Sequence, residues 1–293
     1  MLDALFTYCS KWQMIVNVNK TQIVIYRKAR TEAVLPTGNI FTYAHTKIEI
    51  VPQYKYLGII MHETQQEAAL MHHRLNQGKK AMANWIRRVY VWRFKPRMAS
   101  KLFMTCVLPA FEYGLPIWGA SNYRSHEWQK MERFWRKAAR YIAGAPTRTS
   151  NEAVLGEIGW TSFWTRAAWQ AATMWTRVTR MPECALVRKA MCVQRGFVEN
   201  DVDCWLLQLR DMLLQDCGSC GNRVWNEWWE MANFRLDCER IERASNGKQV
   251  VVKWEDDIKA AVLELAQQRW LAEVQRVESR NGAGNNKLRT YAR

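Results

Sequence analysis

The chain has 293 residues, of which 43 are Lys or Arg and 27 are Asp or Glu, so its formal net charge is +16. Residues 1–150 carry 23 basic and 8 acidic side chains, whereas residues 151–293 carry 20 and 19. Because 48% of the residues are apolar, both halves can bury a core, which excludes a disordered basic tail. A folded surface must carry the positive charge, and such a surface attracts nucleic acid or, as the rival interpretation, an anionic membrane surface.

The sequence predicts neither a membrane span nor a secretory signal. No stretch approaches the roughly 18 uninterrupted apolar residues of a span, and residues 1–12 lack a basic region followed by an apolar core. We therefore expect an intracellular protein, in the nucleus or the cytoplasm, whose eight cysteines are reduced thiols. Only Cys217 and Cys220 have CxxC spacing, and a zinc site would need two further ligands, so buried or surface thiols are the default.

Residues 1–62 change character over short distances. A helical start is followed by a run of β-branched and aromatic residues at 21–26, a turn sequence at 36–39, and short apolar runs at 40–43 and 48–51. This pattern predicts a small α+β region with short strands.

Helical periodicity begins at Thr64, where Pro and Gly become sparse. The spacing predicts one long helix over 64–90, a second from Pro96 to Pro109 or Gly114, and a third over 125–142. Beyond the break at 144–146, the pattern predicts four or five further helices, the last over 255–278. The expected fold is mostly α with a small α+β N-terminal part, divided into residues 1–62, 63–148 and 149–293.

Five segments then resemble one family in the same order along the chain. They are Tyr8-Cys9-x-x-Trp12-x-x-x-Val16-x-x-Asn19-Lys20-Thr21, Tyr54-Lys55-Tyr56-Leu57-Gly58-Ile59, Leu108-Pro109-x-x-Glu112-Tyr113-Gly114-x-x-x-Trp118, Leu155-Gly156-x-x-x-Gly159-Trp160 and Lys287-Leu288-Arg289-Thr290-Tyr291. They are similar to the C-terminal part of the reverse transcriptases of non-LTR (LINE-type) retrotransposons. The resemblance implies the end of a polymerase palm in 1–62, a basic helical thumb in 63–148 and a helical extension in 149–293.

The second segment resembles the primer-grip hairpin of that family. Gly58 would let the backbone approach nucleic acid closely, and Tyr56 and Leu57 would pack against the sugar and base edge of the primer. Without the resemblance, Tyr54, Tyr56, Leu57 and Ile59 would be alternating faces of a half-buried strand.

The resemblance also implies a role for Lys20 at the leaving pyrophosphate, as an acid or an electrostatic partner. The alternative is that Asn19 and Lys20 form a turn that leads into the strand at Thr21. Both interpretations stay open at this point.

The catalytic aspartates of a polymerase are missing. Nucleotide addition uses two divalent cations about 4 Å apart, held by aspartates, yet no aspartate lies between Asp3 and Asp201. In the family the aspartate pair precedes the Trp12 segment, so Mg²⁺ would belong to an upstream palm. We expect a fragment without cofactors of its own, inactive as a polymerase when alone.

Residues 68–111 contain no carboxylate but many cations, as expected of a surface that touches phosphates. The candidate contacts are Arg74, Lys79, Lys80, Arg87, Arg88, Arg93, Lys95, Arg97 and Lys101. Tyr90, Trp92 and Phe94 are interleaved with them. We expect Trp85 in the core and Trp92, in a loop, as a stacking platform for a base.

Three hypotheses remain. The first is a reverse-transcriptase fragment that binds RNA and DNA as a template–primer duplex. The second is a non-enzymatic helical nucleic-acid-binding protein derived from a retroelement. The third is a helical module that binds a partner through its neutral, Trp-rich half. Trp225, Trp228 and Trp229 are candidates for a groove that takes a partner helix, but Trp at these spacings more often packs in a core. Salt-sensitive binding of RNA or DNA separates the first two from the third.

Overall fold

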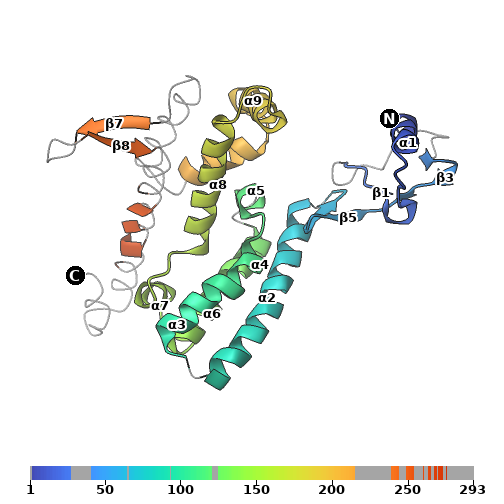
Figure 1. Cartoon of the computed structure of the whole chain (residues 1–293). Helices are drawn as coiled ribbons and strands as arrows, with labels where there is room; N and C mark the ends of the chain where they lie inside the picture. The colour runs from blue at the N-terminus through green and yellow to red at the C-terminus, as the bar shows by residue number, and fades with distance from the viewer. Residues whose placement is uncertain are drawn as a thin grey trace. The chain divides into compact units, whose positions relative to one another are not determined.

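The computed structural model describes residues 2–27, 41–64, 66–92, 94–120, 125–214, 239–243 and 249–253, and residues 260, 263–264, 267–268, 270–272 and 275. These residues form two compact units, 1–73 and 74–293 (Figure 1). They are mostly helical with a few short strands, as predicted. None of the helices among these residues is long and apolar enough to cross a membrane.

The first unit is built from one helix and short strand pairs. Helix α1 (Leu2–Lys11) precedes a 3-10 turn, η1 (Val18–Lys20), and strand β1 (Gln22–Ile23). Strand β1 pairs in parallel with β4 (Glu49–Ile50), and β2 (Thr42–Tyr43) pairs in antiparallel fashion with β3 (Thr46–Lys47). The short strands predicted from runs 21–26, 40–43 and 48–51 are therefore present, whereas the turn predicted at 36–39 lies outside the described residues.

A hairpin follows, formed by β5 (Gln53–Tyr56) and β6 (Ile59–His62), with Tyr56 opposite Ile59. Its two turn residues, Leu57 and Gly58, have φ values of 46° and 85°. A two-residue turn with positive φ at both positions matches the right-handed twist of the strands. Glycine adopts this conformation readily, whereas for a residue with a side chain, such as Leu57, the conformation costs about 1–2 kcal/mol of free energy.

The second unit begins within α2 (Gln66–Trp92), which continues from the first unit. Helices α3 (Pro96–Cys106), α4 (Leu108–Glu112), α5 (Leu115–Trp118) and α6 (His126–Ala143) follow. The helix predicted from Pro96 is divided into α3 and α4, α5 was not predicted, and α6 matches the helix predicted over 125–142. Their ends have local causes: Pro96 occupies the first turn of α3, Ser125 accepts a hydrogen bond from the Trp128 amide, and Gly144 ends α6 in the left-handed conformation.

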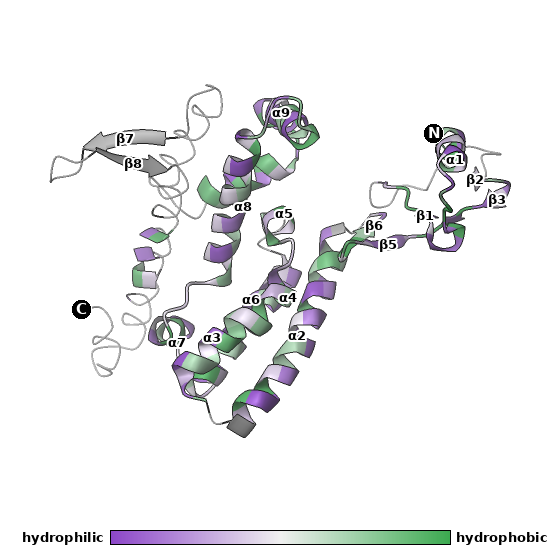
Figure 2. Ribbon diagram, viewed as in Figure 1, coloured by the Kyte–Doolittle hydropathy of each residue, from purple (hydrophilic) through white to green (hydrophobic). Residues whose placement is uncertain are grey.

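An aromatic core joins α3 and α6 to α7 (Asn151–Glu157) and α8 (Phe163–Thr179). The rings of Trp135 and Trp160 stack with their centroids 4.2 Å apart, and Phe103 lies 5.0 Å from Trp160. Hydrophobic positions recur along these helices (Figure 2). The boundary predicted between residues 148 and 149 therefore lies inside the 74–293 unit, where residues from both sides share one core.

The remaining described elements are α9 (Leu186–Glu199), a helical stretch over 205–214, and the antiparallel strands β7 (Glu239–Arg243) and β8 (Gln249–Lys253). The sequence predicted helices here, so the β7–β8 pair corrects the expectation of an all-helical extension. Three consecutive valines, 250–252, give β8 its strand propensity. The described part of 260–275 is helical, in agreement with the helix predicted over 255–278.

Candidate nucleic-acid interface

One half of α2 presents cations to solvent. Because each residue of an α-helix advances by about 100°, the exposed Lys79, Lys80, Arg87 and Arg88 fall within the same half of the circumference. The opposite half carries the buried Leu75, Met82 and Trp85, which face the core. We call the exposed half, with its four cations, the α2 cationic face. It gathers charges that are spread over ten residues of sequence onto one surface.

Three further candidate cations lie where the chain leaves α2 and enters α3. Lys95, Arg97 and Lys101 are all exposed, and Arg97 and Lys101 are one helical turn apart on α3. Arg93 lies outside the described residues.

Glu112, the first carboxylate after the acid-free stretch of sequence, already has hydrogen-bond partners. Glu112 accepts hydrogen bonds from Arg166, at 2.9 Å between Nη2 and Oε2, and from Gln170, at 3.1 Å. It is half-buried in this network. The positive field of α2 and α3 is therefore not cancelled by the carboxylate that ends the acid-free stretch of sequence.

Arg74 differs from the other candidates because it is only 6% exposed. Its guanidinium lies over the ring of Tyr113, 4.7 Å from the centroid. Burial lowers the pKa of Arg74, while the electrostatic interaction with Tyr113 opposes that shift. Arg74 thus belongs to the packing of α2 against the segment after α4, and the prediction that it contacts phosphate is corrected by its position.

The aromatic residues among the cations separate into core and surface. Trp85 is buried, with its ring 5.5 Å from that of Phe103, which confirms the prediction for this residue. Trp92 ends α2 instead of lying in a loop, since the helix continues two residues past its predicted end. Tyr90 is 79% exposed and Phe94 36% exposed. These two rings are the described aromatic side chains that border the α2 cationic face.

The β5–β6 hairpin, in the first unit, displays two of the predicted primer contacts at its tip. Tyr56 is 57% exposed and Leu57 73% exposed, so neither side chain is core. Leu57, an exposed apolar residue, has a positive φ, which costs free energy for any residue other than glycine. Such outliers concentrate at sites that bind ligands.

Lys20 lies in the same unit, at the end of η1. The Asn17 side chain accepts a hydrogen bond from the Lys20 amide, and the chain then enters β1. The Tyr54 hydroxyl donates to the Lys20 carbonyl oxygen over 3.4 Å, which brings Lys20 beside the hairpin. Its geometry is that of the turn considered as the alternative, with an exposed ammonium group.

Metal chemistry has no assembled donor set in the described part of the chain. No three His, Cys, Asp or Glu side chains there lie close enough to hold an ion. Cys217 and Cys220 lie outside the described residues, as do Trp225, Trp228 and Trp229.

One residue near the cations could not be found from sequence. Glu157, at the end of α7, lines the same pocket as Arg97 and Lys101 of α3, although more than fifty residues separate them in the chain. No periodicity or motif marks Glu157, and only the folding of α7 against α6 brings it there.

No protein-family model, no curated protein and no solved structure matches this chain.

Proposed function

We propose that the chain binds the duplex of template and primer through phosphate contacts, as the thumb and palm end of a reverse transcriptase of the non-LTR retrotransposon type. The observation that carries this proposal is the α2 cationic face. Lys79, Lys80, Arg87 and Arg88 project from one side of a long helix, in a stretch of sequence free of carboxylates. Cations spaced along a rigid rod suit a regular row of phosphates and read no particular base.

Two further features support the proposal. Lys95, Arg97 and Lys101 extend the positive charge into α3, and Tyr90 and Phe94 offer flat apolar faces beside it. In the first unit, the exposed tip of the β5–β6 hairpin suits contact between Tyr56 and Leu57 and the primer end. An anionic membrane surface would also attract cations, but burial in a membrane needs an apolar side on the helix, and the apolar side of α2 is packed in the core.

A salt series tests nucleic-acid binding directly. Seven exposed cations are available, and if about six of them contact phosphate, the logarithm of the affinity should fall with the logarithm of the salt concentration at a slope of about −4 to −5. The measurement is fluorescence anisotropy with a labelled RNA–DNA hybrid. A slope near zero would remove the assignment of the α2 cationic face.

Primer extension tests the polymerase part of the proposal. The chain contains no aspartate between Asp3 and Asp201, so we expect no nucleotide addition on an RNA template with magnesium or manganese. A polyacrylamide gel of extension products measures this. Template-dependent synthesis by the purified chain would contradict the expectation while leaving the binding proposal intact.

A further inference from the structure

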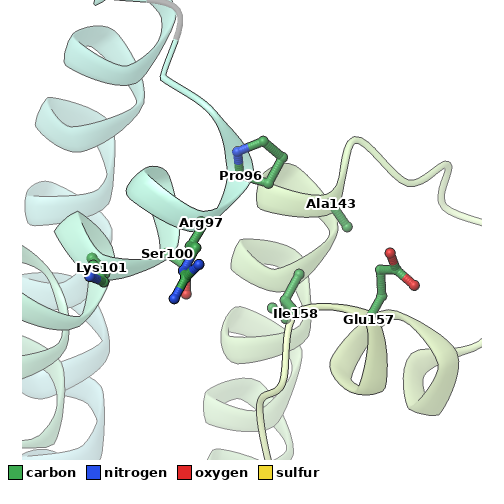
Figure 3. Close-up of a pocket in the computed structure, with 7 residues that line it drawn as sticks. All are labelled: Pro96, Arg97, Ser100, Lys101, Ala143, Glu157 and Ile158. Carbon is green, nitrogen blue, oxygen red and sulfur yellow. The ribbon is translucent and has the colours of Figure 1, made fainter.

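A pocket opens beside α3, with a volume of about 430 Å³. This volume lies within the range of about 300–1,000 Å³ that is typical of small-molecule sites. Figure 3 shows the side chains that line it. They come from the start of α3, the last residue of α6 and the end of α7: Pro96, Arg97, Ser100, Lys101, Ala143, Glu157 and Ile158.

The lining separates positive and negative charge. Arg97 and Lys101 stand on α3, whereas the Glu157 carboxylate belongs to α7 on the other side of the pocket (Figure 3). A ligand that satisfies both sides has an anionic group at one end and hydrogen-bond donors at the other. A plain anion such as inorganic phosphate satisfies only the α3 side.

Ser100, which precedes Lys101 on α3, is held in place. Its Oγ accepts a hydrogen bond from the Trp160 indole over 2.9 Å, and the Trp160 ring is stacked on Trp135. Because that bond uses Ser100 as an acceptor, its hydroxyl hydrogen can point to an anionic oxygen. Pro96, Ala143 and Ile158 add apolar surface, against which a flat ring can lie.

We propose that this pocket binds one nucleoside monophosphate unit. Arg97, Lys101 and Ser100 would hold its phosphate, and Glu157 would accept from its sugar hydroxyls or its exocyclic amino group. The base would lie on the apolar wall. The unit can be an unpaired terminal nucleotide of a bound strand, in which case the inference rests on the proposed function, or it can be a free nucleotide.

Two probes distinguish these sources. The first is a pair of short RNA–DNA hybrids, one blunt and one with a single unpaired nucleotide at each end. Because burial of one base against the apolar wall, with its phosphate on Arg97 and Lys101, should contribute about a factor of ten to affinity, we expect the hybrid with unpaired ends to bind about tenfold more tightly. The second probe is adenosine monophosphate, titrated by isothermal calorimetry.

Two pairs of variants locate the effect. Ala143→Leu fills the pocket and should remove the preference for unpaired ends, whereas Ala190→Leu, on the exposed side of α9, should retain it. Arg97→Ala should also remove the preference, while Arg88→Ala, outside the pocket, should weaken both hybrids by the same factor. The Arg pair keeps the test decisive if Ala143→Leu does not fold, because both arginines are exposed.

Each result supports or overturns the proposal that the pocket binds a nucleoside monophosphate unit. Preference for unpaired ends that the pocket variants abolish supports the strand as the source, and binding of adenosine monophosphate without that preference supports a free nucleotide. Equal binding of both hybrids with no binding of adenosine monophosphate overturns the proposal, as does a preference that survives in both pocket variants. If neither hybrid binds at all, the proposed function fails, and the adenosine monophosphate titration alone decides the pocket.

Discussion

Replacing Arg87 and Arg88 by Gln should weaken the binding of duplex nucleic acid about 30-fold at physiological salt, because each lost phosphate contact reduces the number of counterions released on binding. The salt slope should become less steep by about two. The reason lies in the position of the pair: both side chains are exposed on the α2 cationic face, and the change leaves the buried half of α2 intact. Anisotropy of a labelled RNA–DNA hybrid over a salt series measures both quantities.

The matched control is the double change Arg177→Gln and Lys189→Gln. It removes the same charge from exposed positions on α8 and α9, away from α2 and α3. If binding depends only on the net charge of the chain, both double variants should lose affinity equally. That outcome would contradict a defined interface. A loss confined to the Arg87 and Arg88 variant would locate the contact on α2.

The surface of α2 could be predicted from sequence because helical periodicity fixes which side chains share a face. Apolar residues at 75, 82 and 85 set the buried half, and the cations between them then had to be exposed. Arg74 follows the same rule, because its eleven-residue separation from Trp85 makes about three helical turns and places it on the buried half of α2. The Tyr113 ring, supplied by the segment after α4, covers it, and a contact between residues so distant leaves no mark in the pattern of either segment.

In the hairpin, too, one part of the structure could be predicted from sequence and another could not. The resemblance over 54–59 implied a hairpin with Gly58 in a tight turn, and the structure has two strands joined there. The alternating residues alone indicated one half-buried strand. The positive φ of Leu57 was not predicted, because leucine is a poor residue for that conformation and only the pairing of Tyr56 with Ile59 imposes it. The β7–β8 pair was missed because its charged residues and valines lie in a region read as helical.

The boundary predicted between residues 148 and 149 lies inside one compact unit, 74–293. Gly144 and Pro146 break the chain, which predicts the end of a domain. The break only turns the chain: Glu132 of α6 accepts a hydrogen bond from the Trp164 amide over 2.9 Å, at the start of α8. A buried carboxylate thus caps a helix on the far side of the predicted boundary, within the compact unit 74–293.

Trp135→Ala should destabilise the 74–293 unit by about 3–5 kcal/mol, the usual cost of removing a large buried ring. Trp135 is fully buried, its indole donates to the Thr161 carbonyl oxygen over 2.9 Å, and its ring contacts those of Phe103, Trp160 and Phe163. Deletion leaves a cavity between α3, α6 and α8 and removes the donor to that carbonyl oxygen. Hydrogen exchange of the α6 and α8 amides in the full chain measures the loss.

Tyr90→Ala is the aromatic control, and it should behave in the opposite way. Tyr90 is 79% exposed, so the change in unfolding free energy should stay within about 0.5 kcal/mol. If its ring stacks on a base or a sugar, affinity for the RNA–DNA hybrid should fall about tenfold. Equal losses of amide protection in the two variants would contradict the assignment of Trp135 to the core and Tyr90 to the interface. Because the two rings belong to the same unit, the comparison separates the aromatic residues that build the fold from those that are available to nucleic acid.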